Sequence, residues 1–307
     1  EGSQKIKKKE FEYQFWQGCL QLYYFMEVME VISRIWWHGG EPSILVSALQ
    51  KKQKKRKTQR QTPDQRFPSG LRKHLIGGKM RGRKKNWRIY MKIDRTSPVG
   101  VFDSGVGGLT VAREIMRNLP SEKIVYFGDT ARVPYGSKSK DTIIRYSRQI
   151  CHFLKEQGVK AIVIACNTAS AFALDAVKEN SEIPVLGVIE SGARVAAKET
   201  VNKKVGVIGT VGTISSGIHA EYLRRLNPEI TVIGKACPLF VPLVEEGWLH
   251  DPVTVEVATR YLKELKQKEI DTLILGCTHY PLIRSTIREV MGEKVRLVNP
   301  AYETALE

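Results

Sequence analysis

The sequence predicts an α/β protein of two similar lobes, each built on a doubly wound parallel sheet, with a pseudo-twofold axis relating them and the active site between them. Residues 161–170 and 272–281 carry this prediction, since each runs from apolar residues through a small residue to a cysteine and a threonine. Such runs are typical of buried parallel strands. Two shorter stretches rich in Val and Gly, 99–105 and 205–211, precede them at similar distances. The repetition indicates one α/β unit used twice.

The first unit begins with a strand that runs into a glycine-rich loop. Loop 103–108 is followed by Thr110 where a dinucleotide-binding loop would have its third glycine, which argues against such a cofactor. Its glycines and the helix that follows suit a small anion. Loop 128–136 combines turn-forming residues with Arg and Tyr and suits the lining of a polar ligand site. The pattern predicts strands at 99–102, 123–127, before Cys166 and at 185–189, helices at 109–118, 140–157 and 169–178, and a crossover from 190.

The second unit repeats this order. A hydroxyl-rich loop, 209–213, stands where the first unit has its Asp-Ser-Gly loop. The last residues, 299–307, have the pattern of the first turns of a helix. The sequence predicts a strand from Val205, a helix at 215–226, strands at 230–234 and 271–275, helices at 252–267 and 282–291, and a strand at 295–298.

Two thiols follow equivalent strands, and this pairing indicates their chemistry. Ligands of open α/β sheets bind at the carboxyl ends of the strands, so Cys166 and Cys277 are expected to face one crevice. Neither lies in a metal-ligand spacing, and a labile disulfide between two lobes is disfavoured by geometry. Two thiols that act as acid and base on opposite faces of one carbon would invert a stereocentre. Asp103 and His279 could orient or shuttle protons.

The distribution of charge and the number and spacing of cysteines limit the classes of function that this chain can have. The net charge of +17 is concentrated at the front, because residues 1–90 hold 21 Lys and Arg against 7 Asp and Glu, whereas residues 91–307 hold 28 against 25. The second part is therefore not expected to bind nucleic acid. Five cysteines form no CxxC pair, and Cys19, Cys151 and Cys237 are assigned structural or incidental roles. We expect a cytoplasmic protein without a membrane span, and a homodimer stays an open alternative.

Residues 1–90 differ in composition from the rest of the chain. Basic runs at 51–57 and 81–85 predict disorder over 50–90, and residues 20–37 have the pattern of a short amphipathic helix. Two alternatives stay open for this segment, a nucleic-acid-binding arm or a non-native extension in front of a natural start at Met91. The second is favoured by the abrupt change in composition.

The chain carries four ordered motifs, at residues 100–110, 133–136, 165–169 and 276–281. In order and spacing they resemble those of the glutamate racemase family (aspartate/glutamate racemases), and the resemblance covers about 97–307. The resemblance implies a cofactor-independent isomerase with no metal that interconverts L- and D-glutamate and supplies D-glutamate for peptidoglycan, the cell wall and cell shape. It implies a first lobe of 97–190 plus 299–307 and a second lobe of 191–298. Family chains continue past the position of Glu307, so we expect the first lobe to be incomplete.

The family motifs also assign roles to residues. Cys166 and Cys277 become the proton donor and acceptor, Asp103 assists the first thiol, and His279 and Glu245 assist the second. The substrate-binding pairs of the family fall on Asp103 and Ser104, Tyr135 and Gly136, Asn167 and Thr168, and Thr278 and His279. Two other functions stay open at this point. One is a racemase of another acidic amino acid, aspartate, and the other is an inactive fragment whose basic front segment binds nucleic acid.

Overall fold

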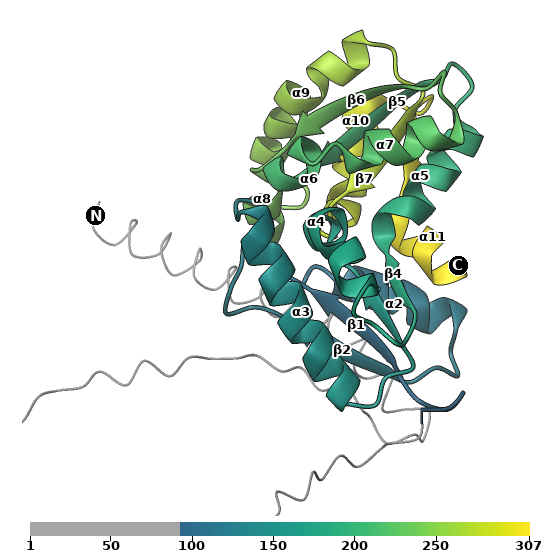
Figure 1. Ribbon diagram of the computed structural model, residues 1–307. Coiled ribbons are helices and arrows are strands. Elements are labelled where there is room, and N and C mark those ends of the chain that lie inside the picture. The colour runs from purple at the N-terminus through teal and green to yellow at the C-terminus, as the bar shows by residue number, and fades with distance from the viewer. Residues whose placement is uncertain (1–92) are drawn as a thin grey trace, which may run out of the picture. The chain divides into compact units, whose positions relative to one another are not determined.

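The computed structural model describes residues 93–307, which contain two four-stranded parallel sheets, one at the centre of each lobe (Figure 1). The strand order is β2-β1-β3-β4 in the first sheet and β6-β5-β7-β8 in the second. Strands β5 to β8 are thus arranged in the second sheet in the same order as β1 to β4 in the first. This confirms the predicted two-lobed α/β fold.

The first lobe has helices on both faces of its sheet. Neighbouring residues of one strand enter different cores: Phe102 packs with Ile143 and Leu154, whereas Val101 packs with Ile115. Alternate residues of a strand point to opposite faces, so a sheet covered on both sides needs continuous apolar runs. The elements are β1 (Val99–Asp103), α2 (Leu109–Asn118), β2 (Ile124–Gly128), α3 (Lys140–Glu156), β3 (Ala161–Ile164), α4 (Asn167–Lys178) and β4 (Val185–Gly187).

The second lobe follows the same plan. Its longest helix begins where Asp251 accepts a hydrogen bond from the Val253 amide at 2.7 Å, with Pro252 in the first turn, which is a favourable helix start. The elements are α5 (Val188–Glu199), β5 (Lys204–Gly209), α6 (Val211–Ser215), α7 (Ile218–Leu226), β6 (Thr231–Ala236), α8 (Phe240–Glu245), α9 (Pro252–Gln267), β7 (Thr272–Gly276), the 3₁₀ turn η1 (Tyr280–Ile283), α10 (Arg284–Met291) and β8 (Arg296–Val298). A last helix, α11 (Pro300–Leu306), follows β8.

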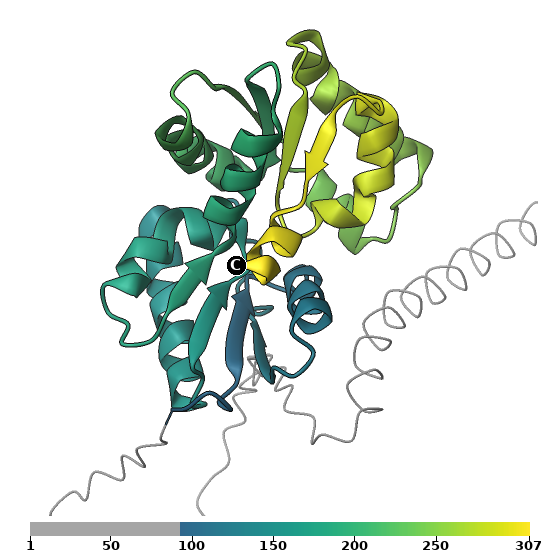
Figure 2. The same ribbon diagram turned by 90° about the vertical axis from the view of Figure 1, so that its right-hand side faces the viewer.

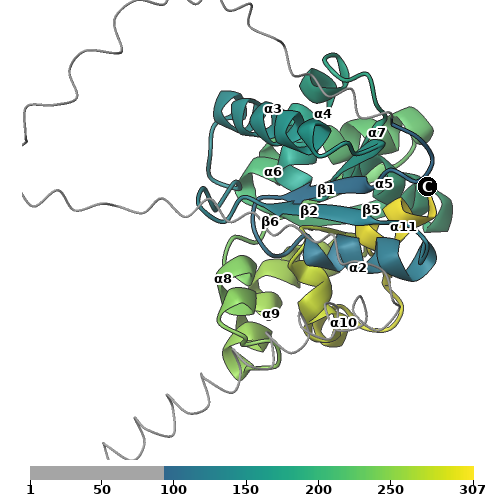
Figure 3. The same ribbon diagram turned by 90° about the horizontal axis from the view of Figure 1, so that it is seen from below.

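Two helices connect the lobes. Helix α5 follows the first sheet, yet its Ala193 and Ala196 belong to a core of the second lobe. Helix α11 follows the second sheet, yet its Ala301 and Ala305 pack with residues of α2 in the first lobe. Figure 2 shows α11 in yellow at the junction, and Figure 3 shows it beside α2 and α5. The chain thus crosses between the lobes twice.

Two predicted elements are wrong in detail. The strand predicted over 185–189 ends at Gly187, because Gly187 is the extended cap of α5, and the crossover predicted from 190 lies in this helix. The helix predicted over 215–226 begins only at Ile218 as α7, because Gly217 separates it from the short helix α6, which lies almost entirely before the predicted start. This glycine has a φ of +69°, a left-handed conformation that interrupts a helix and that glycine adopts without strain.

Some expectations fall outside the described part of the chain. The amphipathic helix at 20–37, the disorder over 50–90 and the role of Cys19 all concern residues 1–92. Within residues 93–307, no helix combines the length and the apolar character needed to cross a membrane.

Candidate active site

Both predicted thiols lie at the carboxyl ends of central strands. Cys166 directly precedes α4, and its Sγ accepts a hydrogen bond from the Ala169 amide at 3.5 Å. Cys277 follows β7 in the same position of the second sheet. Both side chains are buried. The sequence pattern therefore located both cysteines correctly in the fold.

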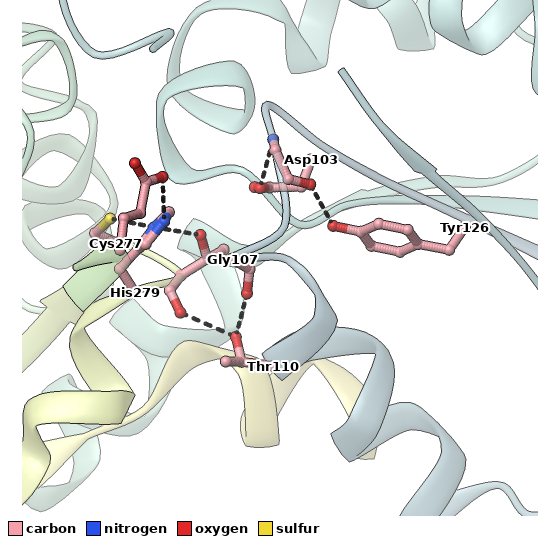
Figure 4. Close-up of polar contacts among 9 residues, drawn as sticks. Asp103, Gly107, Thr110, Tyr126, Cys277 and His279 are labelled. Carbon is pink, nitrogen blue, oxygen red and sulfur yellow. Dashed lines mark hydrogen bonds and ion pairs between the residues drawn. The ribbon is translucent and has the colours of Figure 1, made fainter. Parts of the chain in front are cut away.

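The second thiol has a histidine and a carboxylate behind it. His279 Nδ1 lies 3.7 Å from Cys277 Sγ, and its Nε2 lies 3.1 Å from Glu245 Oε1 at the end of α8 (Figure 4). Burial opposes a charged His279, but the hydrogen bonds to Cys277 and Glu245, and the negative charges of Cys277 and Asp103, outweigh it and raise its pKa to about 10. The hydrogen bond to His279 lowers the pKa of Glu245. The arrangement favours an imidazolium beside Cys277.

The first thiol has an aspartate beside it instead. Asp103 ends β1 and is fully buried, and its Oδ2 accepts a hydrogen bond from the Gly105 amide at 2.9 Å. Burial raises the pKa of Asp103, and the positive charge of His279 works against this. Burial also raises the pKa of Cys166 to about 12, helped by the negative charges of Asp103 and Cys277, while hydrogen bonds from Ala169 and Ser104 lower it. Cys166 is therefore a neutral thiol at neutral pH.

The glycine-rich loop of the first lobe lies against the turn of the second lobe that carries Cys277 and His279. Thr110 donates a hydrogen bond to the Thr278 carbonyl at 3.0 Å (Figure 4). A Cβ atom on Gly107 would lie 2.5 Å from both His279 Cε1 and Thr278 Oγ1, so only glycine fits there. Tyr126 supports the loop from below by donating to the Gly105 carbonyl at 2.8 Å. The loop that follows Asp103 thus meets, across the two lobes, the turn that carries His279.

A second contact between the lobes lies near Cys166. The Thr168 hydroxyl is 2.9 Å from that of Thr210 and 3.0 Å from that of Thr213. Close by, the Gly212 amide donates to the Gly136 carbonyl at 2.9 Å. Thr110, Thr210 and Thr213 were not among the predicted site residues. The hydroxyl-rich loop was visible in the sequence, but no local pattern shows which residues meet across a lobe boundary.

Two of the residues predicted to contact substrate have a buried oxygen atom without a hydrogen-bond partner in the described part of the chain. Asp103 Oδ1 and Asn167 Oδ1 are buried and have no hydrogen-bond partner within residues 93–307. Buried acceptors without a donor are uncommon because each costs the desolvation of that group. A bound ligand with N–H groups would remove this cost.

Tyr135 uses its hydroxyl inside the first lobe. The side chain is buried, and its OH donates to Asp129 Oδ2 at 2.5 Å. Asp129 is also paired with Arg132, whose Nε lies 2.7 Å from the same oxygen. This network fixes the loop that carries Gly136, so the Tyr135 side chain has a structural role in the first lobe.

The remaining described cysteines pack in the cores. Cys151 of α3 belongs to the core of the first lobe and Cys237 to that of the second. Burial raises the pKa of each thiol to about 12. Both are structural residues, which matches the role expected for them.

Comparison with known proteins identifies the family. The model of the Asp/Glu/hydantoin racemase family matches residues 106–305. The chain belongs to this racemase family. Among curated members, a glutamate racemase of Geobacter metallireducens is 56% identical over 207 residues, which is 67% of this chain and 77% of the relative. One from Oceanobacillus iheyensis is 53% identical over 68% of this chain and 77% of the relative.

Solved structures of racemases share the fold. The crystal structure of a glutamate racemase isoform from Bacillus anthracis is 46% identical, with a TM-score of 0.68 over 69% of this chain and 80% of that one. The enzyme from Francisella tularensis, solved in complex with D-glutamate, is 44% identical, with a TM-score of 0.65 over 69% and 79% of the two chains. An aspartate racemase of Picrophilus torridus is only 21% identical, with a TM-score of 0.51 over 68% and 91%, and shares the fold alone.

Proposed function

We propose that this chain is a glutamate racemase that moves the Cα proton of glutamate between two thiols. One observation carries the proposal: two buried cysteines follow equivalent strands of a duplicated unit, and each has a polar group of its own lobe acting on it, Asp103 on Cys166 and His279 on Cys277. An acid and a base on opposite faces of one carbon are what inversion requires. The site residues act as the sequence assigned them, with Cys166 and Cys277 as the proton-transferring pair.

The charges of the two sides differ, which suits an acid–base pair. The imidazolium of His279, held by Glu245, lies against Cys277 Sγ, so we assign the base to that side. On the other side Cys166 is a neutral thiol that can return a proton. After one turnover the protonation states of the thiols are exchanged. Substrate of opposite configuration then reacts in the reverse direction.

We propose that the substrate supplies the missing hydrogen-bond donors on the Cys166 side of the site. The ammonium group of an amino acid would donate to Asp103 Oδ1 and Asn167 Oδ1, the two buried acceptors that lack partners in the described chain. A positive charge there would cancel the negative charge of Asp103, one cause of the raised pKa of Cys166. The proposed substrate-binding site also includes Ser104, Thr168, Thr278 and the backbone of Tyr135 and Gly136.

Glutamate is the proposed substrate because the four relatives described above that are named glutamate racemases match at 44–56% identity. The aspartate racemase of Picrophilus torridus matches at 21%. We further propose that the enzyme works in the cytoplasm without a cofactor and supplies D-glutamate for peptidoglycan. A homodimer is retained as a proposal on family resemblance alone.

Circular dichroism of amino acids incubated with the full 307-residue chain tests the proposal. The ellipticity of L-glutamate and of D-glutamate should each decay to zero, while that of L-aspartate persists. Cys166→Ala and Cys277→Ala should each abolish the decay. Cys151→Ala, which removes a buried core thiol elsewhere in the first lobe, should leave it in place. Decay with aspartate but not glutamate would contradict the proposed substrate.

A further inference from the structure

Each lobe reaches across to the turn that carries the other lobe's thiol. In the first lobe, Thr110 lies in the first turn of α2, which follows central strand β1. In the second lobe, Thr213 lies in α6, which follows the equivalent strand β5. Thr110 contacts Thr278, the residue after Cys277, and Thr213 contacts Thr168, two residues after Cys166. The two contacts occupy matching places in the duplicated fold.

Both contacts are sheltered from water. The four threonines Thr110, Thr278, Thr168 and Thr213 are 8%, 6%, 2% and 1% exposed. A buried carbonyl or hydroxyl that loses its partner costs more than a surface group does, so these contacts hold their geometry. They are therefore suited to set the distance between parts of the site that belong to different lobes.

The contact at Thr110 acts on the main chain. Its hydroxyl reaches the carbonyl oxygen of Thr278, between Cys277 and His279, and the nearby Gly107 leaves no space for a side chain against His279. Figure 4 shows Thr110 below Cys277 and His279, next to Gly107, whose carbonyl also accepts a hydrogen bond from the Thr110 hydroxyl. Movement of the turn would carry both the thiol and its histidine.

We propose that Thr110 and Thr213 are positioning residues, each of which holds the opposite lobe's cysteine turn in place for proton transfer. This inference rests on the proposed two-thiol racemisation. Thr110 acts on the Cys277 side, and Thr213 on the Cys166 side. Neither exchanges a proton with the substrate.

Substrates deuterated at Cα distinguish the two sides. Each enantiomer loses its deuteron to one thiol and gains a proton from the other. If one thiol is misplaced, its proton transfer becomes slower. The isotope effect on kcat/KM then rises for the enantiomer that this thiol deprotonates and falls for the other enantiomer.

Thr110→Val keeps the shape of the side chain and removes the hydroxyl. We expect kcat to fall about 10- to 100-fold, as for other small misplacements of reacting groups, with a smaller change in KM. The isotope effects of the two enantiomers should diverge. Thr213→Val should make them diverge in the opposite sense, and Thr110→Ser should restore the wild-type values.

Thr286→Val is the matched control. Thr286 is 2% exposed and donates to the Leu249 carbonyl at 2.9 Å, but this bond lies within the second lobe. The control should lose thermal stability and keep wild-type isotope effects. Isotope effects that stay equal to wild type, or shift together, in Thr110→Val and Thr213→Val would overturn the inference. A wild-type chain that does not racemise glutamate would instead overturn the proposed function.

Discussion

Glu245 Oε1 lies 3.1 Å from His279 Nε2 and joins α8 to the turn that follows β7. The carboxylate is 49% exposed, whereas the histidine side chain is 7% exposed. Through this contact, the half-exposed carboxylate of Glu245 interacts with the buried His279 ring, which in turn contacts Cys277. It is one of the interactions that keep the pKa of His279 at about 10 despite burial.

Glu245→Gln should shift the pH dependence of racemisation. The amide oxygen can still accept a hydrogen bond, but the negative charge is gone, so the pKa of His279 falls. The imidazolium is then lost at lower pH, and the alkaline limb of kcat/KM should move down by about one pH unit. Steady-state rates across the pH range measure this. Glu246→Gln, at the exposed neighbouring residue, is the control, and an equal shift there would refute the role of Glu245.

Asp103→Asn should make Cys166 more acidic while it slows the reaction. The negative charge of Asp103 is the second cause, after burial, of the raised pKa of this thiol. Without the charge, thiolate forms at lower pH. Ultraviolet titration of thiolate, with the signal of the matching Cys166→Ala protein subtracted, isolates this residue. An unchanged titration would show that the two groups do not interact.

Gly107→Ala should impair catalysis more than stability. The new methyl group would lie 2.5 Å from His279 Cε1, so the ring must move away from Cys277. We expect kcat/KM to fall about 100-fold. Gly105→Ala, in the same loop, meets only the Val133 Cγ1 atom at 3.1 Å and should cost much less. Equal losses in the two variants would mean that the loop as a whole, not the contact with His279, is sensitive.

His219→Phe should remove part of the acid sensitivity of folding. His219 is buried in α7, and within the described chain neither ring nitrogen has a hydrogen-bond partner. Burial lowers its pKa from 6.5 to about 4, so the unfolded state binds a proton more readily than the folded state between these values. The free energy of unfolding is therefore unaffected by His219 above about pH 6.5. It decreases as the pH falls, by about 3 kcal/mol at pH 4, because protonation of His219 favours the unfolded state.

Urea unfolding at about pH 5 and pH 8 measures this effect. The difference in unfolding free energy between the two pH values should be about 2 kcal/mol smaller in His219→Phe than in wild type. His152→Gln changes a histidine whose side chain is 75% exposed and should leave the difference unaltered. The same pH dependence in His219→Phe and wild type would show that another group controls acid unfolding.

The fold could be predicted largely because burial leaves a strong local pattern. The apolar strands before Cys166 and Cys277 are covered on both faces, so their runs stand out in the sequence. Helix α9 was predicted with its observed bounds, since Asp251 and Pro252 mark its start. The boundary at Gly187 was missed because a short apolar strand leads directly into an apolar helix, and no polar residue separates them.

The site could be predicted only where its residues lie in local motifs. The structure places His279 between Cys277 and Glu245, three residues that the sequence had already selected. The partnership of Thr110 with Thr278 was not visible, because it joins residues far apart in the chain through a single hydroxyl. The spacing of apolar residues predicts which face of a helix or strand is buried. It does not predict which side chain of the other lobe will contact that face.

Proton exchange during the first turnovers in heavy water tests most directly whether two thiols flank one carbon. With either enantiomer of glutamate, deuterium should appear at Cα of the product while the remaining substrate keeps its proton, because different thiols remove and return it. Deuterium that enters the recovered substrate as fast as the product, or a product that keeps the original proton, would mean that one base serves both faces and would contradict the two-thiol site.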